Sequence, residues 1–217
     1  MTTLDIPTLL DAVRTSRVVA VVRGDSAEHA ADAARILFRE GIRLVEIAMT
    51  TPETPSAIAD VAPSVPRGSY LGAGTVMTPQ DVDVVAAAGA SFIVTPSVSA
   101  SVAHAVDRGI PVLAGAFTAT EAYEAWRQGA AAVKLFPASA VGPGYLKALA
   151  DPFPQIPFLA VGGMGLAELP KYVAAGALGI GAGGPLVGDG AKGGDPGALA
   201  ERARAFVAAA AELDGGA

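Results

Sequence analysis

Residues 111–136 read PVLAGAFTATEAYEAWRQGAAAVKLF and contain the unit whose repetition decides the fold. Two short apolar runs, centred on Leu113 and Val133, flank a segment at 118–129 that has a threonine as N-cap and a glycine as stop signal. The runs are continuous instead of alternating, which is typical of strands buried on both faces of a parallel sheet. The stretch therefore predicts a strand, a helix and a second, parallel strand.

The same unit recurs along the whole chain. Apolar runs follow one another at steps of 20 to 27 residues, and they predict eight strands centred near Ala20, Ile47, Leu71, Ile93, Leu113, Val133, Leu159 and Ile180. Helical patterns between them include 27–38, 82–88 and 166–176, and two further helices are expected at 6–14 and 196–213.

An eightfold strand–helix repeat that closes on itself is an α/β fold of the (β/α)8 TIM-barrel type. We predict a single barrel domain over residues 1–217, with an extra N-terminal helix that covers the bottom of the barrel. An open doubly wound sheet is the main rival, but Arg23-Gly24-Asp25 after the first strand lacks the G-x-G-x-x-G signature of that fold.

Composition restricts the partners and the location. Although 52% of the 217 residues are hydrophobic, no apolar stretch approaches the ~20 residues of a membrane-spanning helix. Residues 1–17 lack the long apolar core of a signal peptide, so we expect a cytoplasmic protein without a membrane partner. The formal charge of −6 and the scattered basic residues give no stripe for nucleic acid.

Several metal and thiol chemistries are also disfavoured. The absence of cysteine removes disulfides, thiolate nucleophiles and zinc-thiolate sites. His29 and His104 fall in predicted helices, so a histidine metal site is not expected.

Two charged residues stand inside apolar strands, where a solvated charge has no obvious place. Lys134 lies in the run 131–136 and Glu46 in the run 44–48. If Val133 and Leu135 pack under the helices, strand alternation points Lys134 into the barrel, and the same argument applies to Glu46. The two side chains are therefore predicted to share one cavity.

This pairing has a catalytic and a structural interpretation. A buried ammonium without a partner tends to become the neutral amine, which is a nucleophile. Lys134 could then form a Schiff base with a carbonyl substrate, and Glu46 could move the protons. Burial would raise the pKa of Glu46 and the ammonium would lower it, and the sequence does not say which effect dominates. Alternatively, the two residues form a structural ion pair in the barrel interior.

Glycine pairs follow the last two strands. Gly162 and Gly163 come after strand seven, and Gly183 and Gly184 after strand eight, the positions at which barrels most often bind phosphate. Glycines also make tight turns, so each pair alone is weak. Together they favour a phosphorylated ligand.

Two side chains could hold a second anionic group. Arg23 at the end of the first strand could clamp a carboxylate, with a hydroxyl from Thr75, although a surface salt bridge is an equal alternative for Arg23. The other lysines, Lys147, Lys171 and Lys192, are expected to be solvated.

Nearly the whole chain resembles the family of 2-keto-3-deoxy-6-phosphogluconate and 2-keto-3-deoxy-6-phosphogalactonate aldolases, which includes 4-hydroxy-2-oxoglutarate aldolases. The resemblance implies a class I aldolase without metal or cofactor that releases pyruvate, with Lys134 as Schiff-base lysine and Glu46 as general acid/base. It also implies a homotrimer. The motifs that carry it are Val22-Arg23-Gly24, Val45-Glu46-Ile47, Gly72-Ala73-Gly74-Thr75-Val76, Ile93-Val94-Thr95-Pro96, Val133-Lys134-Leu135-Phe136-Pro137 and Val161-Gly162-Gly163.

The resemblance also assigns substrate-binding positions. Thr75, Pro96 and Phe136 would line a pocket for the pyruvate part of a keto acid, and Arg23 would meet its carboxylate. Some gluconate-type members have an arginine four residues after the catalytic glutamate. This chain has Thr50 there, which places more of the carboxylate binding on Arg23.

Two further departures bear on the substrate. Many members place a serine after the strand-eight glycine to hold phosphate, whereas this chain reads Gly183-Gly184-Pro185. The gluconate type has threonine before the strand-seven glycine pair, whereas Val161 resembles the galactonate type. Phosphogalactonate is therefore slightly preferred over phosphogluconate as the substrate expected to yield pyruvate and glyceraldehyde 3-phosphate.

Other functions remain open at this point. They are a 4-hydroxy-2-oxoglutarate aldolase, a non-aldolase phosphate-binding barrel enzyme such as an epimerase or a thiamine-phosphate synthase relative, and a sugar-acid sensor. The glycine-rich segment 188–197 could be a mobile lid or a linker to the last helix.

Overall fold

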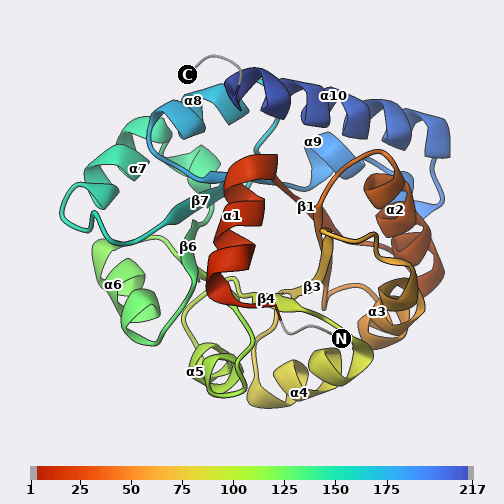
Figure 1. Ribbon diagram of the computed structural model, residues 1–217, viewed down its shortest axis with the longest axis horizontal. Coiled ribbons are helices and arrows are strands. Elements are labelled where there is room, and N and C mark those ends of the chain that lie inside the picture. The colour runs from red at the N-terminus through yellow and green to blue at the C-terminus, as the bar shows by residue number, and fades with distance from the viewer. Residues whose placement is uncertain (1–3, 215–217) are drawn as a thin grey trace.

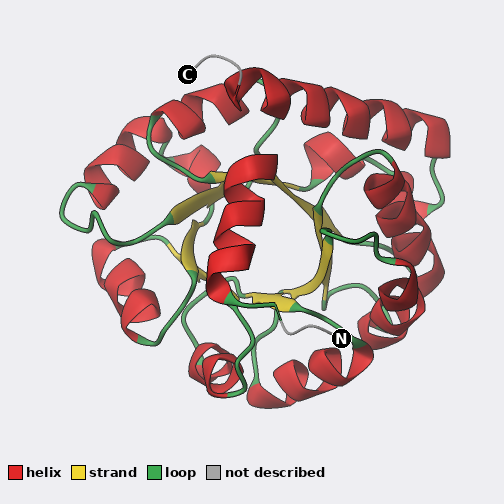
Figure 2. Cartoon of the chain, in the orientation of Figure 1, coloured by secondary structure: helices red, strands yellow, loops and turns green. Residues whose placement is uncertain are grey.

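Eight parallel strands close into a barrel in the order of the sequence. The computed structural model describes residues 4–214. The strands form an inner ring in Figure 2, and their bounds are β1 Val18–Val22, β2 Leu44–Ala48, β3 Tyr70–Gly74, β4 Phe92–Val94, β5 Val112–Ala116, β6 Ala132–Leu135, β7 Phe158–Val161 and β8 Gly179–Ala182. Each of the eight predicted strand centres lies inside one of these strands. The predicted (β/α)8 barrel is confirmed.

Helices surround the strands as an outer ring (Figure 1). The ring contains α2 Ala27–Arg39, α3 Thr54–Val61, α4 Pro79–Ala88, α5 Ala100–Asp107, α6 Ala119–Arg127, α7 Pro143–Ala150, α8 Leu169–Ala174, α9 Gly184–Val187 and α10 Pro196–Asp214, whereas α1 Ile6–Ser16 lies outside it. Short 3-10 turns occur at η1 Ala62–Ser64, η2 Ala138–Ala140 and η3 Gly190–Lys192.

The predicted N-terminal helix, α1, lies across one end of the barrel in Figure 1. Asp5 caps it by accepting a hydrogen bond from the Thr8 backbone N–H at 2.9 Å. Its buried residues Leu9, Ala12 and Val13 join an apolar cluster with residues inside the barrel. This helix therefore closes the amino-terminal end, and access to the interior is left to the carboxyl-terminal ends of the strands.

Strand alternation separates two apolar layers. Val45, Ile47, Val133 and Leu135 pack in the large cluster between sheet and helices. The opposite faces of the strands supply the interior cluster, which contains Val19, Leu44, Phe92, Val94, Leu113, Ala132, Leu159 and Val161. The interior of the barrel is thus packed with apolar side chains.

Local capping explains where the predicted helices begin and end. Thr118 precedes α6 and forms a capping box with Glu121, as the threonine signal predicted. The helix expected at 166–176 is shorter, at Leu169–Ala174. Residues 166–168 form a turn in which Glu168 accepts a hydrogen bond from the Gly165 backbone N–H at 3.2 Å.

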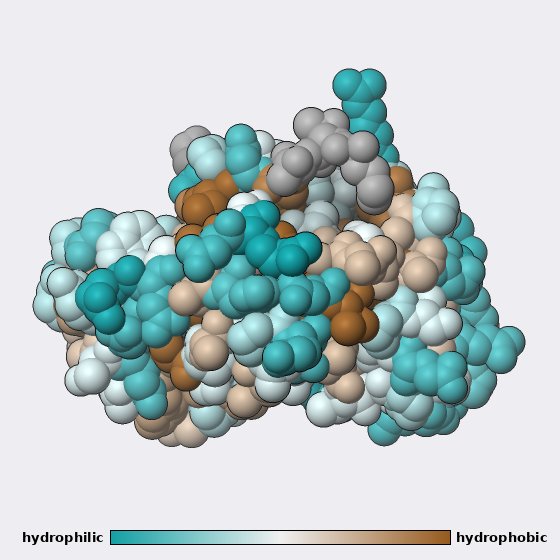
Figure 3. Space-filling model, turned by 90° about the horizontal axis from the view of Figure 1, so that it is seen from below, coloured by the Kyte–Doolittle hydropathy of each residue, from teal (hydrophilic) through white to brown (hydrophobic). Residues whose placement is uncertain are grey.

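The surface is mixed in character. The face shown in Figure 3 is largely hydrophilic or neutral, with strongly apolar side chains in small separate areas. Within the part of the chain that the structure describes, no helix combines the length and the hydropathy needed to span a membrane.

Candidate active site

Lys134 and Glu46 enter the barrel interior from opposite walls. Lys134 stands in β6, in register with Gly115 of β5 and Leu159 of β7. Glu46 stands in β2, in register with Val21 of β1 and Gly72 of β3. Four strand positions of an eight-stranded barrel separate them, so the two charged groups face each other across the interior.

Both charged side chains are buried, yet they do not close into an ion pair. Lys134 is 6% exposed and Glu46 is 1% exposed. Among residues 4–214, neither takes part in an ion pair within 4.0 Å. The Glu46 Oε2 atom is buried without a hydrogen-bond partner. A structural ion pair would satisfy that oxygen, whereas this arrangement leaves it available to a third group between the two side chains.

Burial decides the electrostatics of Glu46. Desolvation raises the pKa of this carboxyl group above its usual range, while the positive charges of Lys134 and Arg23 act in the opposite direction. Because the raised pKa favours the protonated acid, Glu46 can carry a proton to and from a bound group.

The absence of a side chain at Gly74 leaves space for the Glu46 carboxyl group. A Cβ atom at Gly74 would lie 2.7 Å from Glu46 Oε1 and 2.8 Å from its Cδ. A side chain at this position would push the carboxyl group out of place. The second glycine of the Gly72-Ala73-Gly74-Thr75 motif therefore has a direct steric reason.

Thr75 follows β3 in a conformation that is rare for its residue type. Its φ of 58° lies in the left-handed region, where a β-branched side chain is strained. The half-buried threonine stands directly after the glycine that borders Glu46. The structure thus brings this predicted site residue to the carboxyl-terminal end of the barrel.

Phe136 marks the entrance beside the lysine. The Lys134 Nζ atom lies 5.2 Å from the centre of the Phe136 ring, within the range of a cation–π contact. The ring itself is 39% exposed. It also borders the β7 loop, because a Cβ atom at Gly162 would meet the ring at 3.2 Å.

Pro96 lies at the same end, on the loop after β4. A Cβ atom at Gly115 would collide with the Pro96 carbonyl group, so the Pro96–Ser97 backbone passes directly over β5. Thr95 fixes this crossing, since its buried hydroxyl donates to the Ser97 carbonyl at 2.7 Å and accepts from the Gly115 N–H at 3.2 Å.

Arg23 is an exposed residue whose side chain is held by Thr50. Its Nε donates a hydrogen bond to Thr50 Oγ1 at 2.9 Å. The adjacent Thr51 hydroxyl accepts from the Gly24 backbone N–H at 2.9 Å. Thr50 therefore orients the guanidinium group, which makes no ion pair with a carboxylate within residues 4–214.

The two predicted glycine pairs occupy different surroundings. Gly183 and Gly184 line a cavity of about 150 Å³ between the ends of β1 and β8, together with Val21, Arg23, Val187, Gly188 and Lys192. Gly162 and Gly163 do not line it. Both have positive φ, and a Cβ atom at Gly163 would lie 2.9 Å from the Ser139 side chain.

Val161, the last residue of β7, is 6% exposed and packs in the interior cluster. Its side chain borders β8, where a Cβ atom at Gly181 would come within 2.7 Å of it. Val161, which the family resemblance links to the galactonate type, therefore lies at the wall of the interior.

Lys192 has a position that the sequence does not predict. It is exposed, as expected, but it lines the same cavity as Arg23, Gly183 and Gly184. The only signal in the sequence is a single basic residue in a glycine-rich segment after the last strand.

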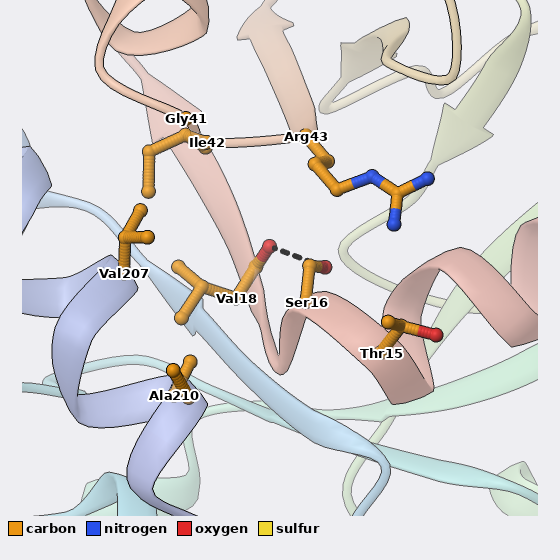
Figure 4. Close-up of a pocket in the computed structure, with 9 residues that line it drawn as sticks. Thr15, Ser16, Val18, Gly41, Ile42, Arg43, Val207 and Ala210 are labelled. Atoms are coloured by element: carbon orange, nitrogen blue, oxygen red, sulfur yellow. Dashed lines mark hydrogen bonds between the residues drawn. The ribbon is translucent and has the colours of Figure 1, made fainter. Parts of the chain in front are cut away.

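A larger hollow lies at the opposite end of the barrel (Figure 4). It has a volume of about 290 Å³ and is lined mainly by α1, α10 and the residues before β2, including Ser16, Ile42, Arg43 and Val207. None of the candidate site residues lines it. The described residues also contain no cluster of three or more acidic or histidine side chains suited to a metal.

The chain is similar to known aldolases over most of its length. Residues 9–196 match the family model described as "Aldolase: KDPG and KHG aldolase". A 2-dehydro-3-deoxy-6-phosphogalactonate aldolase of Escherichia coli K12 is 37% identical over 171 residues, which cover 78% of this chain and 83% of the relative. A 2-dehydro-3-deoxy-phosphogluconate aldolase of Treponema pallidum is also 37% identical, and the match covers 77% of this chain and 80% of the relative.

A solved structure adds a chemical observation on a relative. The KDPG aldolase of Legionella pneumophila, with pyruvate captured at low pH as a covalent carbinolamine intermediate, has a TM-score of 0.78 and 26% identity. The match covers 94% of this chain and 97% of that one. Together with the family match, these similarities show that the chain belongs to the KDPG and KHG aldolase family and is a carbon–carbon lyase.

Proposed function

We propose that this enzyme is a class I aldolase that cleaves a 2-keto-3-deoxy-6-phospho sugar acid to pyruvate and glyceraldehyde 3-phosphate. The observation that carries the proposal is the pair of buried groups, Lys134 and Glu46, on opposite walls of one interior without an ion pair between them. The substrates named for the relatives and the carbinolamine of the Legionella enzyme support it.

The first half of the reaction joins the substrate to the lysine. The unprotonated Lys134 amine adds to the C2 ketone and gives a carbinolamine. Glu46, as the protonated acid, donates a proton to the C2 oxygen, which leaves as water, and the product is an iminium ion. The positive iminium nitrogen then acts as the electron sink for the bond two atoms away.

The second half breaks the carbon–carbon bond. Glu46, now a carboxylate, takes the proton of the C4 hydroxyl, the C3–C4 bond breaks, and its electrons move into the enamine on Lys134. Glyceraldehyde 3-phosphate leaves as the aldehyde. Return of the proton to C3 and hydrolysis of the pyruvate iminium release pyruvate and regenerate the free amine. Arg23, oriented by Thr50, would hold the C1 carboxylate throughout.

Borohydride trapping tests the lysine assignment. Reduction in the presence of pyruvate should leave an irreversible adduct, which peptide mass spectrometry should locate on Lys134. The Lys134→Met variant should form no adduct and have no aldolase turnover. An adduct on another lysine, or turnover that survives in Lys134→Met, would contradict the proposal.

The acid/base assignment has its own variant. Glu46→Gln keeps the shape of the side chain but removes proton transfer, so turnover should fall by about 10²-fold or more. Circular dichroism should show an intact fold. Unchanged turnover would assign the proton transfers to another group.

The epimer preference rests on Val161. A threonine hydroxyl at this wall could pair with a substrate hydroxyl, whereas valine cannot, and an unpaired buried polar group is costly. We therefore propose a slight preference for the phosphogalactonate substrate. Turnover of both epimers and of 4-hydroxy-2-oxoglutarate tests it, and a higher kcat/KM for phosphogluconate would reverse the assignment.

We further propose that the enzyme acts in the cytoplasm as a homotrimer, the assembly that the family resemblance implies. Sedimentation velocity of the purified chain tests the assembly. A single species with the mass of three chains is expected, and a monomer at micromolar concentration would contradict it.

A further inference from the structure

The cavity between β1 and β8 has the charge of an anion site. Its volume is about 150 Å³, and a water takes up about 30 Å³ in the liquid, so there is room for a phosphate group. The charged side chains that line it, Arg23 and Lys192, are both cations, and no carboxylate lines it. Within residues 4–214 neither cation forms an ion pair, and the carboxylates that interact with them electrostatically, Glu46 with Arg23 and Asp25 with Lys192, do so without a direct contact.

Gly183 and Gly184 line the cavity with backbone atoms, and the neighbouring atoms leave room for a side chain at both positions. A Cβ atom at Gly184 would meet nothing within 4 Å, and at Gly183 its nearest neighbour would be 3.7 Å away. Neither glycine has a positive φ. At Gly184, crowding and left-handed backbone, the usual structural reasons for glycine, are therefore absent, and this glycine leaves room for close approach of a ligand to the main chain.

The backbone of Lys192 is held in place beside this floor. The neighbouring Ala191 is buried, and its carbonyl accepts a hydrogen bond from the Asp25 backbone N–H at 3.3 Å. A Cβ atom at Gly24 would lie 2.9 Å from the same carbonyl oxygen. The segment after β8 thus packs against the turn after β1 at this point, so it is held by specific contacts and does more than connect β8 to α10.

The carboxylate of Asp25 interacts electrostatically with Lys192, but it already has a hydrogen-bond partner. Its carboxylate is hydrogen-bonded to His29 Nδ1 at 2.7 Å, and this bond is the main cause of its lowered pKa, with a smaller contribution from Lys192. The ammonium of Lys192 therefore remains free to meet an anion in the cavity.

We propose that Lys192 binds the phosphate group of the substrate in the cavity beside Gly184. The inference rests on the proposed function and extends it by a specificity-determining residue. An ammonium is a suitable point charge for a phosphate dianion. Arg23 lines the same cavity, but its Nε is hydrogen-bonded to Thr50 on the β2 side, so the proposed function leaves it to the carboxylate and Lys192 to the phosphate.

The test compares substrates with and without phosphate. In Lys192→Ala and Lys192→Gln, kcat/KM for the phosphorylated keto acid should fall by about 10- to 100-fold, mainly through KM, because a charge-assisted bond to the substrate is lost. The kcat/KM for the unphosphorylated 2-keto-3-deoxy sugar acid and the borohydride trapping of pyruvate should not change. Lys171→Ala, which removes an exposed lysine paired with Glu168 on α8, is the matched control and should affect neither substrate.

Two further variants make the assignment specific. Adding Gly184→Ser to Lys192→Ala should restore part of the lost kcat/KM for the phosphorylated substrate, since a hydroxyl then replaces the ammonium. Arg23→Ala, in contrast, should lower kcat/KM for both substrates, because both have the carboxylate.

The outcomes separate this inference from the proposed function. If trapping and turnover succeed but the Lys192 variants lose nothing, or lose equally on both substrates, the phosphate assignment is wrong and the aldolase assignment stands. If no aldolase turnover is found at all, calorimetric titration with inorganic phosphate decides the matter. Weaker binding to Lys192→Ala than to the wild type then supports the site, and equal affinity overturns it.

Discussion

Burial at Glu46 couples the chemistry of the site to the stability of the fold. Because desolvation raises the pKa of this carboxyl group in the folded chain, the folded state binds the proton more tightly than the unfolded state does. The free energy of unfolding therefore contains a term that falls as pH rises from about 4.3, the usual glutamate pKa, through the folded pKa.

Glu46→Gln removes this term, since the amide does not ionise. The variant should be more stable than the wild type at neutral pH, and the difference should disappear as pH falls toward about 4. Urea unfolding of both proteins at pH steps from 4 to 8 measures it. A difference that stays constant with pH, or grows toward acid, would contradict the raised pKa.

Thr75 stores backbone strain next to the site. With φ at 58°, glycine should fit this position better than any residue with a Cβ atom. We expect Thr75→Gly to be about 1 kcal/mol more stable than Thr75→Ala in denaturant unfolding. Both variants lose the hydroxyl, so their turnover should fall alike. Equal stability of the two would mean that the conformation is not strained.

The strand β5 shows how a single glycine positions a neighbouring loop. The Pro96–Ser97 backbone lies where the Cβ of residue 115 would be, so Gly115→Ala must displace either β5 or the loop. We expect a loss of stability of about 1–3 kcal/mol, and a lower affinity for pyruvate because Pro96 moves.

Gly144→Ala is the matched control for that change. A Cβ atom at Gly144 would meet nothing within 4 Å, its φ is not positive, and the residue lies in α7. Its stability should stay the same or rise slightly, since alanine favours helix. If Gly115→Ala were equally harmless in thermal unfolding, the close crossing over β5 would not constrain the fold.

The predictability of the elements differs for physical reasons. The strands could be predicted because burial on both faces makes each a continuous apolar run, as at Val18–Val22. Long helices such as α2 could be predicted from their apolar stripe. The short α9 and η3 after β8 could not, because glycine-rich sequence has no periodicity and its conformation depends on contacts such as Ala191 with the β1 turn.

Helix α1 closes the amino-terminal end of the barrel by packing against residues from several strands. Leu9 is fully buried against residues from several strands, so Leu9→Ala should cost about 2–4 kcal/mol of unfolding free energy. Ile6→Ala, at a residue 39% exposed on the same helix, should cost far less. Turnover of the folded fraction should persist in both, because the candidate site lies at the other end. Loss of turnover in the folded fraction of Leu9→Ala would mean that α1 also shapes the site.

The sequence by itself determined the barrel and the inward direction of Lys134 and Glu46, because burial and strand alternation are local properties of each run. It also determined the strand ends at which the candidate groups had to lie. Only the tertiary structure decided that burial outweighs the nearby charges at Glu46, that Thr50 turns Arg23, and that Lys192 reaches the cavity of Gly183 and Gly184. These depend on distances between residues far apart in the chain, which periodicity and spacing do not contain.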